Sequence, residues 1–180
     1  KKGKDDFIPH LLGHEGSGKV VENGRGVTKI QPGDNVILGW IKGDGLDDPG
    51  SQYRKGQIVI NSEAVTTFNE YAVVSENRVV KLPEGVPMDI AVLFGCALLK
   101  GVGMVINEIK PEKGSNIAFL GLGGIGLSAL MASQLFECDH VIAIYVETKK
   151  LDHAKRFGST NVINSRNGNA AELIFDLTAG

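Results

Sequence analysis

The stretch from Asn116 to Lys150 reads NIAFLGLGGIGLSALMASQLFECDHVIAIYVETKK and decides the fold of the second half of the chain. Its first apolar run, residues 116–120, predicts a buried parallel strand, and a glycine-rich turn follows at once. An apolar helical segment from 127 to about 136 precedes a second apolar run, residues 141–145. Strand, glycine turn, helix and strand in this order are typical of the first βαβ unit of a dinucleotide-binding sheet.

The turn between the first strand and the helix carries its glycines at the spacing typical of pyrophosphate binding. Gly121 permits a tight turn, Gly123 leaves the backbone open to the phosphates, and Gly126 lets the helix pack closely on the strand. The N–H groups at the helix start, with the positive end of its dipole, then face the phosphates. The predicted cofactor-binding residues of this turn are Gly121, Gly123, Gly124, Ile125 and Gly126. The alternative is a glycine-rich turn that binds no ligand.

The residues on either side of this unit predict further strands and helices. We expect a small antiparallel β module, because strand-like runs flank a Pro-Gly turn at residues 31–34. The strands expected before the glycine turn are residues 18–22, 27–30, 35–38, 68–75 and 78–82, with one short strand at 57–60 inside a surface loop over 41–62. The other expected elements are helices at 88–94, 96–109, 149–157 (with Thr148 as N-cap and Gly158 as C-cap) and 170–177, and a third parallel strand at 161–164. The fold class is α/β: a β module followed by the first half, βαβαβ, of a doubly wound parallel sheet.

Length, charge and cysteine content limit what the chain can be. Its 180 residues suffice for one full domain or for two small or partial ones. The net charge of −2 gives no electrostatic case for binding nucleic acid or an anionic membrane. No charge-free run of ~18 apolar residues occurs, so we expect no membrane span. Two cysteines, Cys96 and Cys138, cannot build a disulfide framework, and no signal peptide is visible, so we expect a reducing, cytoplasmic setting.

Several sequence features, taken in order along the chain, resemble zinc-dependent medium-chain alcohol dehydrogenases. They are the segment GHEGSG at 13–18, the Pro-Gly-Asp turn at 32–34, the pair Gly95-Cys96 and the glycine turn, and the resemblance covers nearly the whole chain. Residues 56–74 look most like the class III, glutathione-dependent formaldehyde dehydrogenase branch. The resemblance implies two incomplete domains, which are a GroES-like catalytic domain over residues 1–98 and a Rossmann NAD(P)-binding domain over residues 99–180.

The same resemblance implies one catalytic zinc site. His14 matches the zinc-ligating histidine of the family, Cys96 matches one of its two zinc thiolates, and Glu15 matches the acid beside the metal. Two thiolates and one neutral imidazole balance the charge of Zn²⁺ and leave a fourth position open for substrate; alcohol dehydrogenase is itself the standard example of this arrangement. Two of these residues also have simpler interpretations: His14 as a structural histidine of a glycine turn, and Cys96 as a small buried apolar residue.

The end of the second strand of the βαβ unit bears on the choice of cofactor. Tyr145 stands where NAD-preferring members of the fold carry an Asp or Glu. Glu147 points to the same side in an extended chain and can substitute, whereas Lys149 and Lys150 can receive the 2′-phosphate of NADP. We expect Tyr145, Glu147 and Lys150 to contact the cofactor, with weak discrimination and a slight preference for NAD. The alternative is that Tyr145 packs beneath the adenine while both lysines stay solvated.

The chain also departs from the family pattern. The resemblance places the second zinc cysteine and the proton-relaying Ser or Thr upstream of residue 1, and the second half of the cofactor sheet after residue 180. No cysteine falls at 41–55, so we expect no structural zinc, and Lys100 stands where the family usually has Thr. The function expected is an NAD(P)-dependent oxidoreductase for a small alcohol, aldehyde or ketone, homo-oligomeric at full length and inactive as these residues alone. The alternatives are a zinc-free enone or quinone reductase, and a non-catalytic binding or structural protein of the same fold.

Overall fold

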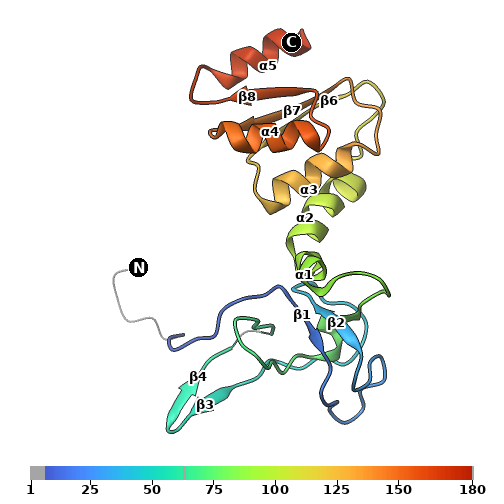
Figure 1. Cartoon of the computed structure of the whole chain (residues 1–180), viewed down its shortest axis with the longest axis vertical. Helices are drawn as coiled ribbons and strands as arrows, with labels where there is room; N and C mark the ends of the chain where they lie inside the picture. Colours follow the sequence, from blue (N-terminus) through green and yellow to red (C-terminus); the bar gives the residue numbers. More distant parts are fainter. Residues whose placement is uncertain (1–6, 63, 180) are drawn as a thin grey trace. The chain divides into compact units, whose positions relative to one another are not determined.

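The structure is a computed structural model that describes residues 7–62 and 64–179. The chain divides into two compact units, Lys1–Cys96 and Ala97–Gly180. Strands β1 to β5 belong to the first unit and strands β6 to β8 to the second (Figure 1). The domain boundary expected from the sequence, between residues 98 and 99, lies close to this division and remains a prediction.

The first unit is built on a three-stranded antiparallel sheet in the order β1-β2-β5. Its strands are β1 (Gly16–Lys19), β2 (Asn35–Leu38) and β5 (Val79–Lys81). The chain turns tightly ahead of β2 at Gly33, which has φ of +96°, and Asp34 N donates to Gln31 O at 3.1 Å. The predicted antiparallel module is therefore confirmed, although β1 begins and ends earlier than residues 18–22.

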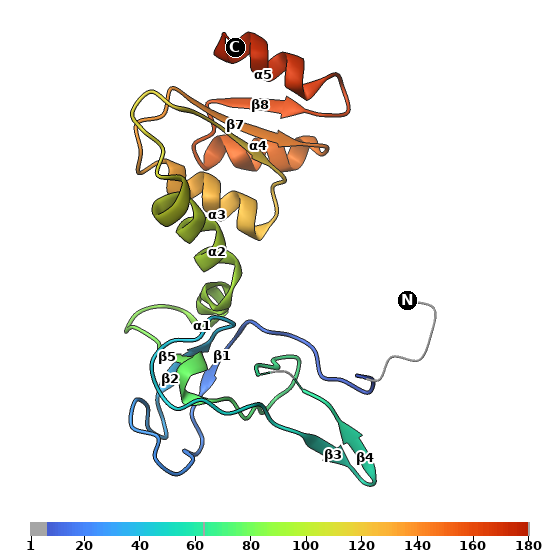
Figure 2. The ribbon, with the colours of Figure 1, turned by 180° about the vertical axis from the view of Figure 1, so that it is seen from behind.

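Short elements complete the first unit. A separate hairpin consists of β3 (Tyr53–Lys55) and β4 (Ile58–Ile60), and Figure 2 shows it as a two-stranded ribbon. The sequence analysis predicted β4 inside a loop and missed β3. A helical run formed by α1 (Met88–Ala91) and the 3-10 helix η2 (Val92–Gly95) packs on the sheet, where Ser17 Oγ donates to Met88 O at 2.7 Å.

Two predicted strands are wrong. Residues 27–30 and 68–75, all within the described part of the chain, form no strand. In the first segment, the N–H groups of Thr28 and Lys29 donate to the carboxylate of Glu76 instead of a neighbouring strand. In the second segment, Val73 N donates to the Tyr53 hydroxyl at 2.9 Å. Side chains thus take the backbone groups that a sheet ladder would need, and alternating sequence alone does not reveal this.

The second unit contains the parallel sheet, in the order β6-β7-β8. The strands are β6 (Asn116–Leu120), β7 (His140–Tyr145) and β8 (Asn161–Asn164). The helical elements are α2 (Ala97–Gly103), the π-helical turn η3 (Met104–Ile109), α3 (Gly124–Ser133), α4 (Thr148–Arg156) and α5 (Ala170–Thr178). The start of a Rossmann fold is confirmed. Three details differ from those predicted. Helix α3 begins directly at the glycine turn, Glu147 and not Thr148 is the N-cap of α4, and Phe157 is its C-cap, with Gly158 as the residue after it.

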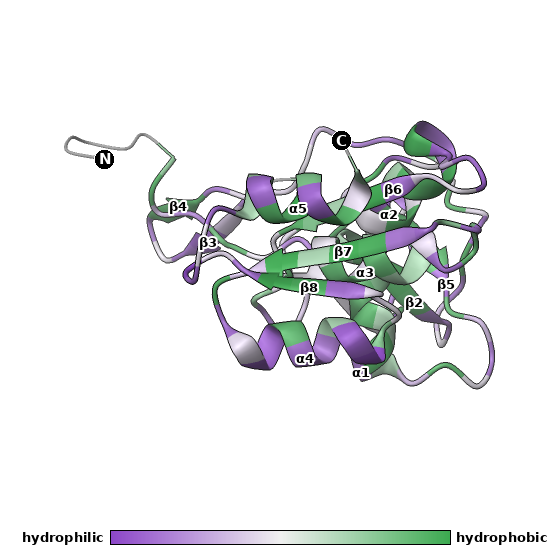
Figure 3. Cartoon of the chain, turned by 90° about the horizontal axis from the view of Figure 1, so that it is seen from above, coloured by the Kyte–Doolittle hydropathy of each residue, from purple (hydrophilic) through white to green (hydrophobic). Residues whose placement is uncertain are grey.

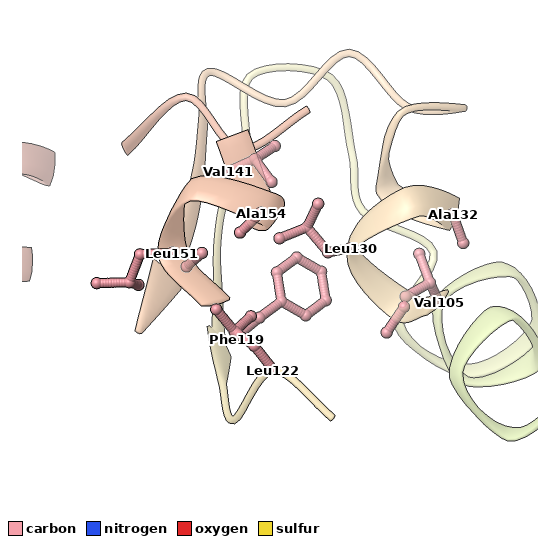
Figure 4. Packing of buried hydrophobic residues seen from close by; sticks show 10 residues of the cluster. Val105, Phe119, Leu122, Leu130, Ala132, Val141, Leu151 and Ala154 are labelled. Carbon is pink, nitrogen blue, oxygen red and sulfur yellow. The ribbon is translucent and has the colours of Figure 1, made fainter. Parts of the chain in front are cut away.

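Helices cover both faces of β7, which is buried on both sides. The edge strand β6 is not buried as the sequence predicted, since Leu120 is 79% exposed and only Phe119 of this strand is fully buried. In β7, the alternate residues Val141 and Ala143 pack with α3 and α4, whereas Ile142 and Ile144 pack under α5. Figure 3 shows the hydrophobic colour running along β7, and Figure 4 shows the Phe119 ring among the side chains of the larger cluster. Burial on both faces explains why the sequence of β7 is a continuous apolar run.

The pair of helices α2 and α3 packs unusually closely at Gly101. A Cβ on Gly101 would overlap Ser128 Oγ and the carbonyl oxygen of Ile125, and would lie 2.8 Å from Ala129 N. Two of these three atoms belong to the backbone of α3, so rotation of a side chain cannot relieve the overlap. Glycine at residue 101 is therefore required by packing between helices rather than by backbone conformation.

We predict that Gly101→Ala lowers the free energy of unfolding by about 1–3 kcal/mol, because the two helices must separate to admit the methyl group. Urea unfolding followed by circular dichroism measures this. Gly103→Ala in the same helix is the matched control, since its Cβ would meet only Asn107 Nδ2 at 3.6 Å. The control should be neutral or stabilising by up to about 1 kcal/mol through helix propensity. Equal stability of Gly101→Ala and wild type would contradict the packing described.

A buried carboxylate joins two loops of the first unit to the 3-10 helix that carries it. Glu76, which is 5% exposed, lies in the 3-10 helix η1 (Glu76–Arg78). Its Oε1 accepts from Thr28 N and Lys29 N at 2.7 Å each, and its Oε2 accepts from Leu46 N at 2.8 Å. The backbone donors, Leu46 first and then Lys29 and Thr28, hold the pKa of Glu76 below its usual range.

We predict that the first unit loses stability in acid partly through Glu76. Because its pKa is lower in the folded state, its contribution is complete above the ordinary value of 4.5 and is lost as the pH falls through the folded value. Glu76→Gln should lower the melting temperature at neutral pH, since the amide nitrogen cannot accept from Leu46 N, and the gap to wild type should narrow in acid. Thermal unfolding at several pH values measures both effects. Glu84→Gln, at an exposed site, is the control; a gap for Glu76→Gln that does not change with pH would count against the account.

Candidate functional site

The backbone on the N-terminal side of His14 is held tightly by neighbouring residues. Gly13 has φ of +90°, and a Cβ there would lie 2.5 Å from Thr67 Oγ1 and 2.7 Å from Phe68 Cδ1. The carbonyl oxygen of Leu12 accepts from Thr67 N at 3.2 Å and from Phe68 N at 3.0 Å. Only glycine fits at residue 13, and the position of the next residue, His14, is fixed as a result.

A second close approach joins the His14 segment to the segment that carries Cys96. A Cβ on Gly95 would lie 2.5 Å from Leu38 O and 3.1 Å from Glu15 Cα, so the backbones of Gly95 and Glu15 are in contact. Cys96 follows Gly95 directly, and it is a free thiol with only 4% of its surface exposed. The structure therefore brings the segments of His14, Glu15 and Cys96 side by side within the first unit.

The sequence analysis missed one aromatic residue of this site. Trp40 lies beside His14, with ring centroids 5.9 Å apart and an interplanar angle of 76°. The pairing of Gly16 with Leu38, extended by two residues on each strand, places His14 opposite Trp40. Trp40 is the single tryptophan of the chain, and it lies two residues after β2, the strand that pairs with β1. Those two facts are the signal that could have identified it.

The donor types of this site fit zinc, but their number does not complete a coordination set. Imidazole and thiolate are the ligands that zinc prefers, and the contact of Gly95 with Glu15 places both segments together. Within the part of the chain that the structure describes, no group of three or more His, Cys, Asp or Glu side chains is close enough to hold a metal ion. His14, Glu15 and Cys96 can therefore supply part of a metal site.

The glycine turn of the second unit has the predicted backbone geometry. Gly121 has φ of +98°, and its N–H donates to Ile144 O at 3.1 Å. A Cβ on Gly126 would overlap the carbonyl oxygen of Gly121, which is the close approach expected from the sequence. A Cβ on Gly123 would meet no atom within 4 Å, and no side chain caps the start of α3. The turn leaves open space where a phosphate group would approach the backbone.

The residues expected to contact the adenosine end of the cofactor follow β7, next to this turn. Tyr145 is half-buried against the larger core cluster, and its carbonyl oxygen accepts from Ser165 N at 3.0 Å. Glu147 is exposed, and its carbonyl oxygen accepts from Lys150 N at 3.1 Å and from Leu151 N at 3.2 Å. The carboxyl ends of β6 and β7 thus carry the turn and these side chains at one edge of the sheet, where such sheets bind their ligands. Their roles remain predictions.

Known proteins resemble the chain over nearly its whole length. Residues 2–84 match the family model described as the alcohol dehydrogenase GroES-like domain. The class-P alcohol dehydrogenase of Arabidopsis thaliana is 28% identical, with 99% of the chain and 55% of that protein aligned. The crystal structure of benzyl alcohol dehydrogenase from Acinetobacter calcoaceticus is 30% identical with a TM-score of 0.82, covering 98% of the chain and 55% of that structure. The alcohol dehydrogenase zinc-binding domain protein of Burkholderia ambifaria is 27% identical with a TM-score of 0.84, covering 98% and 56%.

These alignments also compare the length of the chain with that of its relatives. It spans about half the length of the curated relatives and solved structures that it matches, 55% of the Arabidopsis protein for example. The class III branch expected for residues 56–74 is not distinguished by these matches and remains a prediction.

We predict that Gly95→Ala destabilises the first unit by about 1–3 kcal/mol and exposes Cys96, because the new methyl group must push Leu38 and Glu15 away. Urea unfolding gives the free energy, and mass spectrometry after alkylation gives the rate at each cysteine. Cys138 serves as an internal reference, since burial, and then the charge of Asp139, raises the pKa of its thiol. Cys96 should react faster than in wild type relative to Cys138.

Gly43→Ala is the matched control for this substitution. Its Cβ would lie 3.6 Å from Asn77 O, an ordinary contact, in the same unit. The control should leave the alkylation of Cys96 unchanged. Wild-type stability and wild-type Cys96 reactivity in Gly95→Ala would show that Gly95 and Glu15 are not in contact.

Proposed function

We propose that the chain is part of a zinc- and NAD(P)-dependent oxidoreductase of the medium-chain alcohol dehydrogenase family, which interconverts small alcohols with aldehydes or ketones. The match of residues 2–84 to the alcohol dehydrogenase GroES-like domain and the likeness to alcohol dehydrogenases over nearly the whole chain support the proposal. The observation that carries the proposal is the contact of Gly95 with Glu15, which brings the segments of His14 and Cys96 together. The open glycine turn of the second unit supports the dinucleotide half of the proposal.

The metal-binding role falls to residues of the first unit. The His14 imidazole and the Cys96 thiolate would bind zinc, with Glu15 beside it, and further donors would come from outside the described residues. Bound zinc would polarise the substrate carbonyl or lower the pKa of the alcohol. The small exposed fraction of Cys96, 4%, would keep bulk water away from its bond to the metal.

The cofactor-binding role falls to residues of the second unit. The backbone at Gly121, Gly123 and Gly126, with the start of α3, would bind the pyrophosphate, and the nicotinamide would accept or give the hydride. Tyr145, Glu147 and Lys150 would contact the adenosine ribose. Glu147 can accept hydrogen bonds from ribose hydroxyls and repel a 2′-phosphate, while Lys149 and Lys150 attract one, so we propose weak discrimination with a slight preference for NAD.

Other parts of the proposal concern the whole protein. They are a small-molecule substrate, a homo-oligomer, a cytoplasmic setting, one catalytic zinc without a structural zinc, and inactivity of these residues by themselves. Among the described residues, no single helix is long and apolar enough to cross a membrane, although the bent pair Met88–Gly95 and Ala97–Ile109 reaches that length and composition together. The zinc-free reductase and the non-catalytic protein are the competing functions.

The test is metal analysis combined with alcohol-dependent reduction of NAD⁺ and NADP⁺ by the full-length protein. We expect zinc, turnover that a chelator abolishes, and kcat/KM values for the two cofactors within ~100-fold, which corresponds to ~2.7 kcal/mol. The 180-residue chain should show no turnover. Turnover of enones without zinc would support the zinc-free reductase, and cofactor binding without turnover would support the non-catalytic protein.

We predict that Gly123→Val weakens NAD⁺ binding at least about tenfold, or about 1.4 kcal/mol, without loss of stability. The side chain would occupy the space that the phosphates need, whereas the fold leaves that space empty. Calorimetric titration and thermal unfolding measure the two quantities. Gly126→Ala is the contrasting variant, because its methyl group overlaps Gly121 and should reduce stability. Unchanged NAD⁺ affinity in Gly123→Val would reject the turn as the cofactor site.

A further inference from the structure

We propose that Trp40 and Arg78 are positioning residues that hold the His14 imidazole in one orientation for metal binding. This inference rests on the proposed function, because it assigns a purpose to the surroundings of a metal ligand. It goes beyond that function by naming side chains that would not themselves touch the metal.

His14 requires such support because its side chain is exposed. The tight backbone contacts at Gly13 fix where the side chain begins, but they do not restrict its rotation. An exposed side chain samples several rotamers, and a metal bond must select one of them at an entropic cost. The ring contact with Trp40 at 5.9 Å restricts that rotation, and an edge-to-face pair of this kind favours one geometry.

Trp40 can act as a support because its own position is fixed from both sides. Its backbone N–H donates to Gly95 O at 3.0 Å, the carbonyl directly before Cys96. The preceding residue, Gly39, donates its N–H to Arg78 O at 2.9 Å. One aromatic residue therefore connects the strand of His14, through the β1–β2 register, to the backbone that carries the second proposed ligand.

Arg78 also contacts the indole of Trp40. Its guanidinium carbon lies 5.6 Å from the centroid of the Trp40 ring, within the range of a cation–π contact. Its Nε is buried and has no hydrogen-bond partner among the residues that the structure describes. The cation–π contact places the guanidinium group against the indole ring of Trp40.

Two measurements on wild type and variants of the chain test the inference. The first is the ring-proton NMR spectrum of the four histidines, in which His14 is assigned by its loss in His14→Asn. The second is the affinity for Co²⁺, followed by calorimetry and by quenching of the single tryptophan where it is retained. Unchanged far-UV circular dichroism shows that each variant is folded.

We expect Trp40→Leu to move the His14 ring signals toward those of a freely rotating imidazole and to weaken Co²⁺ binding about tenfold, or about 1.4 kcal/mol. Trp40→Phe should restore both, within about threefold in affinity, because it keeps an aromatic ring beside His14. Arg78→Met should weaken Co²⁺ binding about threefold, the size of an exposed cation–π contact. Arg54→Met, at an exposed arginine of the same unit, is the control and should change nothing.

The two readouts separate failure of the inference from failure of the proposed function. If neither this chain nor the full-length protein shows a saturable Co²⁺ signal that depends on His14, the metal-binding function fails, and the NMR comparison still decides whether Trp40 orients His14. If the His14 ring signals in Trp40→Leu match wild type, the positioning role is wrong whether or not metal binds. Equal Co²⁺ affinity in wild type and Trp40→Leu overturns the functional part of the inference.

Discussion

The contact between the backbones of Gly95 and Glu15 is the constraint on which the first unit's site depends. Residues far apart in sequence meet there because Gly95 has no side chain, and any Cβ would be 2.5 Å from Leu38 O. The carbonyl oxygen of Gly95 itself accepts from the backbone N–H of Trp40. The backbone segments that carry His14, Trp40 and Cys96 are thereby joined in one small region of the first unit.

In the second unit, too, two backbone segments approach each other closely at a glycine, in the glycine turn. Gly126 admits the backbone of Gly121, so α3 begins directly behind β6 and its first N–H groups stay available. Gly101 does the same between α2 and α3. In each case glycine is required because two backbones approach each other. Dehydrogenase chemistry would need both sites, one for the metal and one for the dinucleotide, and each unit builds its own from backbone packing.

Most of the second unit could be predicted from sequence, because its signals are local. The apolar runs of β6 and β7, the glycine spacing and the period of α4 all act within a few residues. The first unit was harder. The strands predicted at 27–30 and 68–75 are wrong because side chains such as Glu76 and Tyr53, distant in sequence, take the backbone donors.

The candidate site shows the same limit of sequence reasoning. Residue type and resemblance identified His14, Glu15 and Cys96, but not Trp40 or Arg78. The roles proposed for Trp40 and Arg78 depend on the β1–β2 strand register and on contacts with an aromatic ring. No short sequence motif encodes either.

The central claim is that His14 and Cys96 serve one metal ion, and X-ray absorption at the zinc edge of the zinc-loaded protein tests it most directly. The account predicts one or more sulfur ligands at ~2.3 Å and one or more nitrogen ligands at ~2.0–2.1 Å. Cys96→Ser should remove or reduce the sulfur shell, and His14→Asn should reduce the imidazole scattering, with the fold intact by circular dichroism. A zinc ion surrounded by oxygen and nitrogen alone, or a spectrum unchanged by both substitutions, would contradict the account.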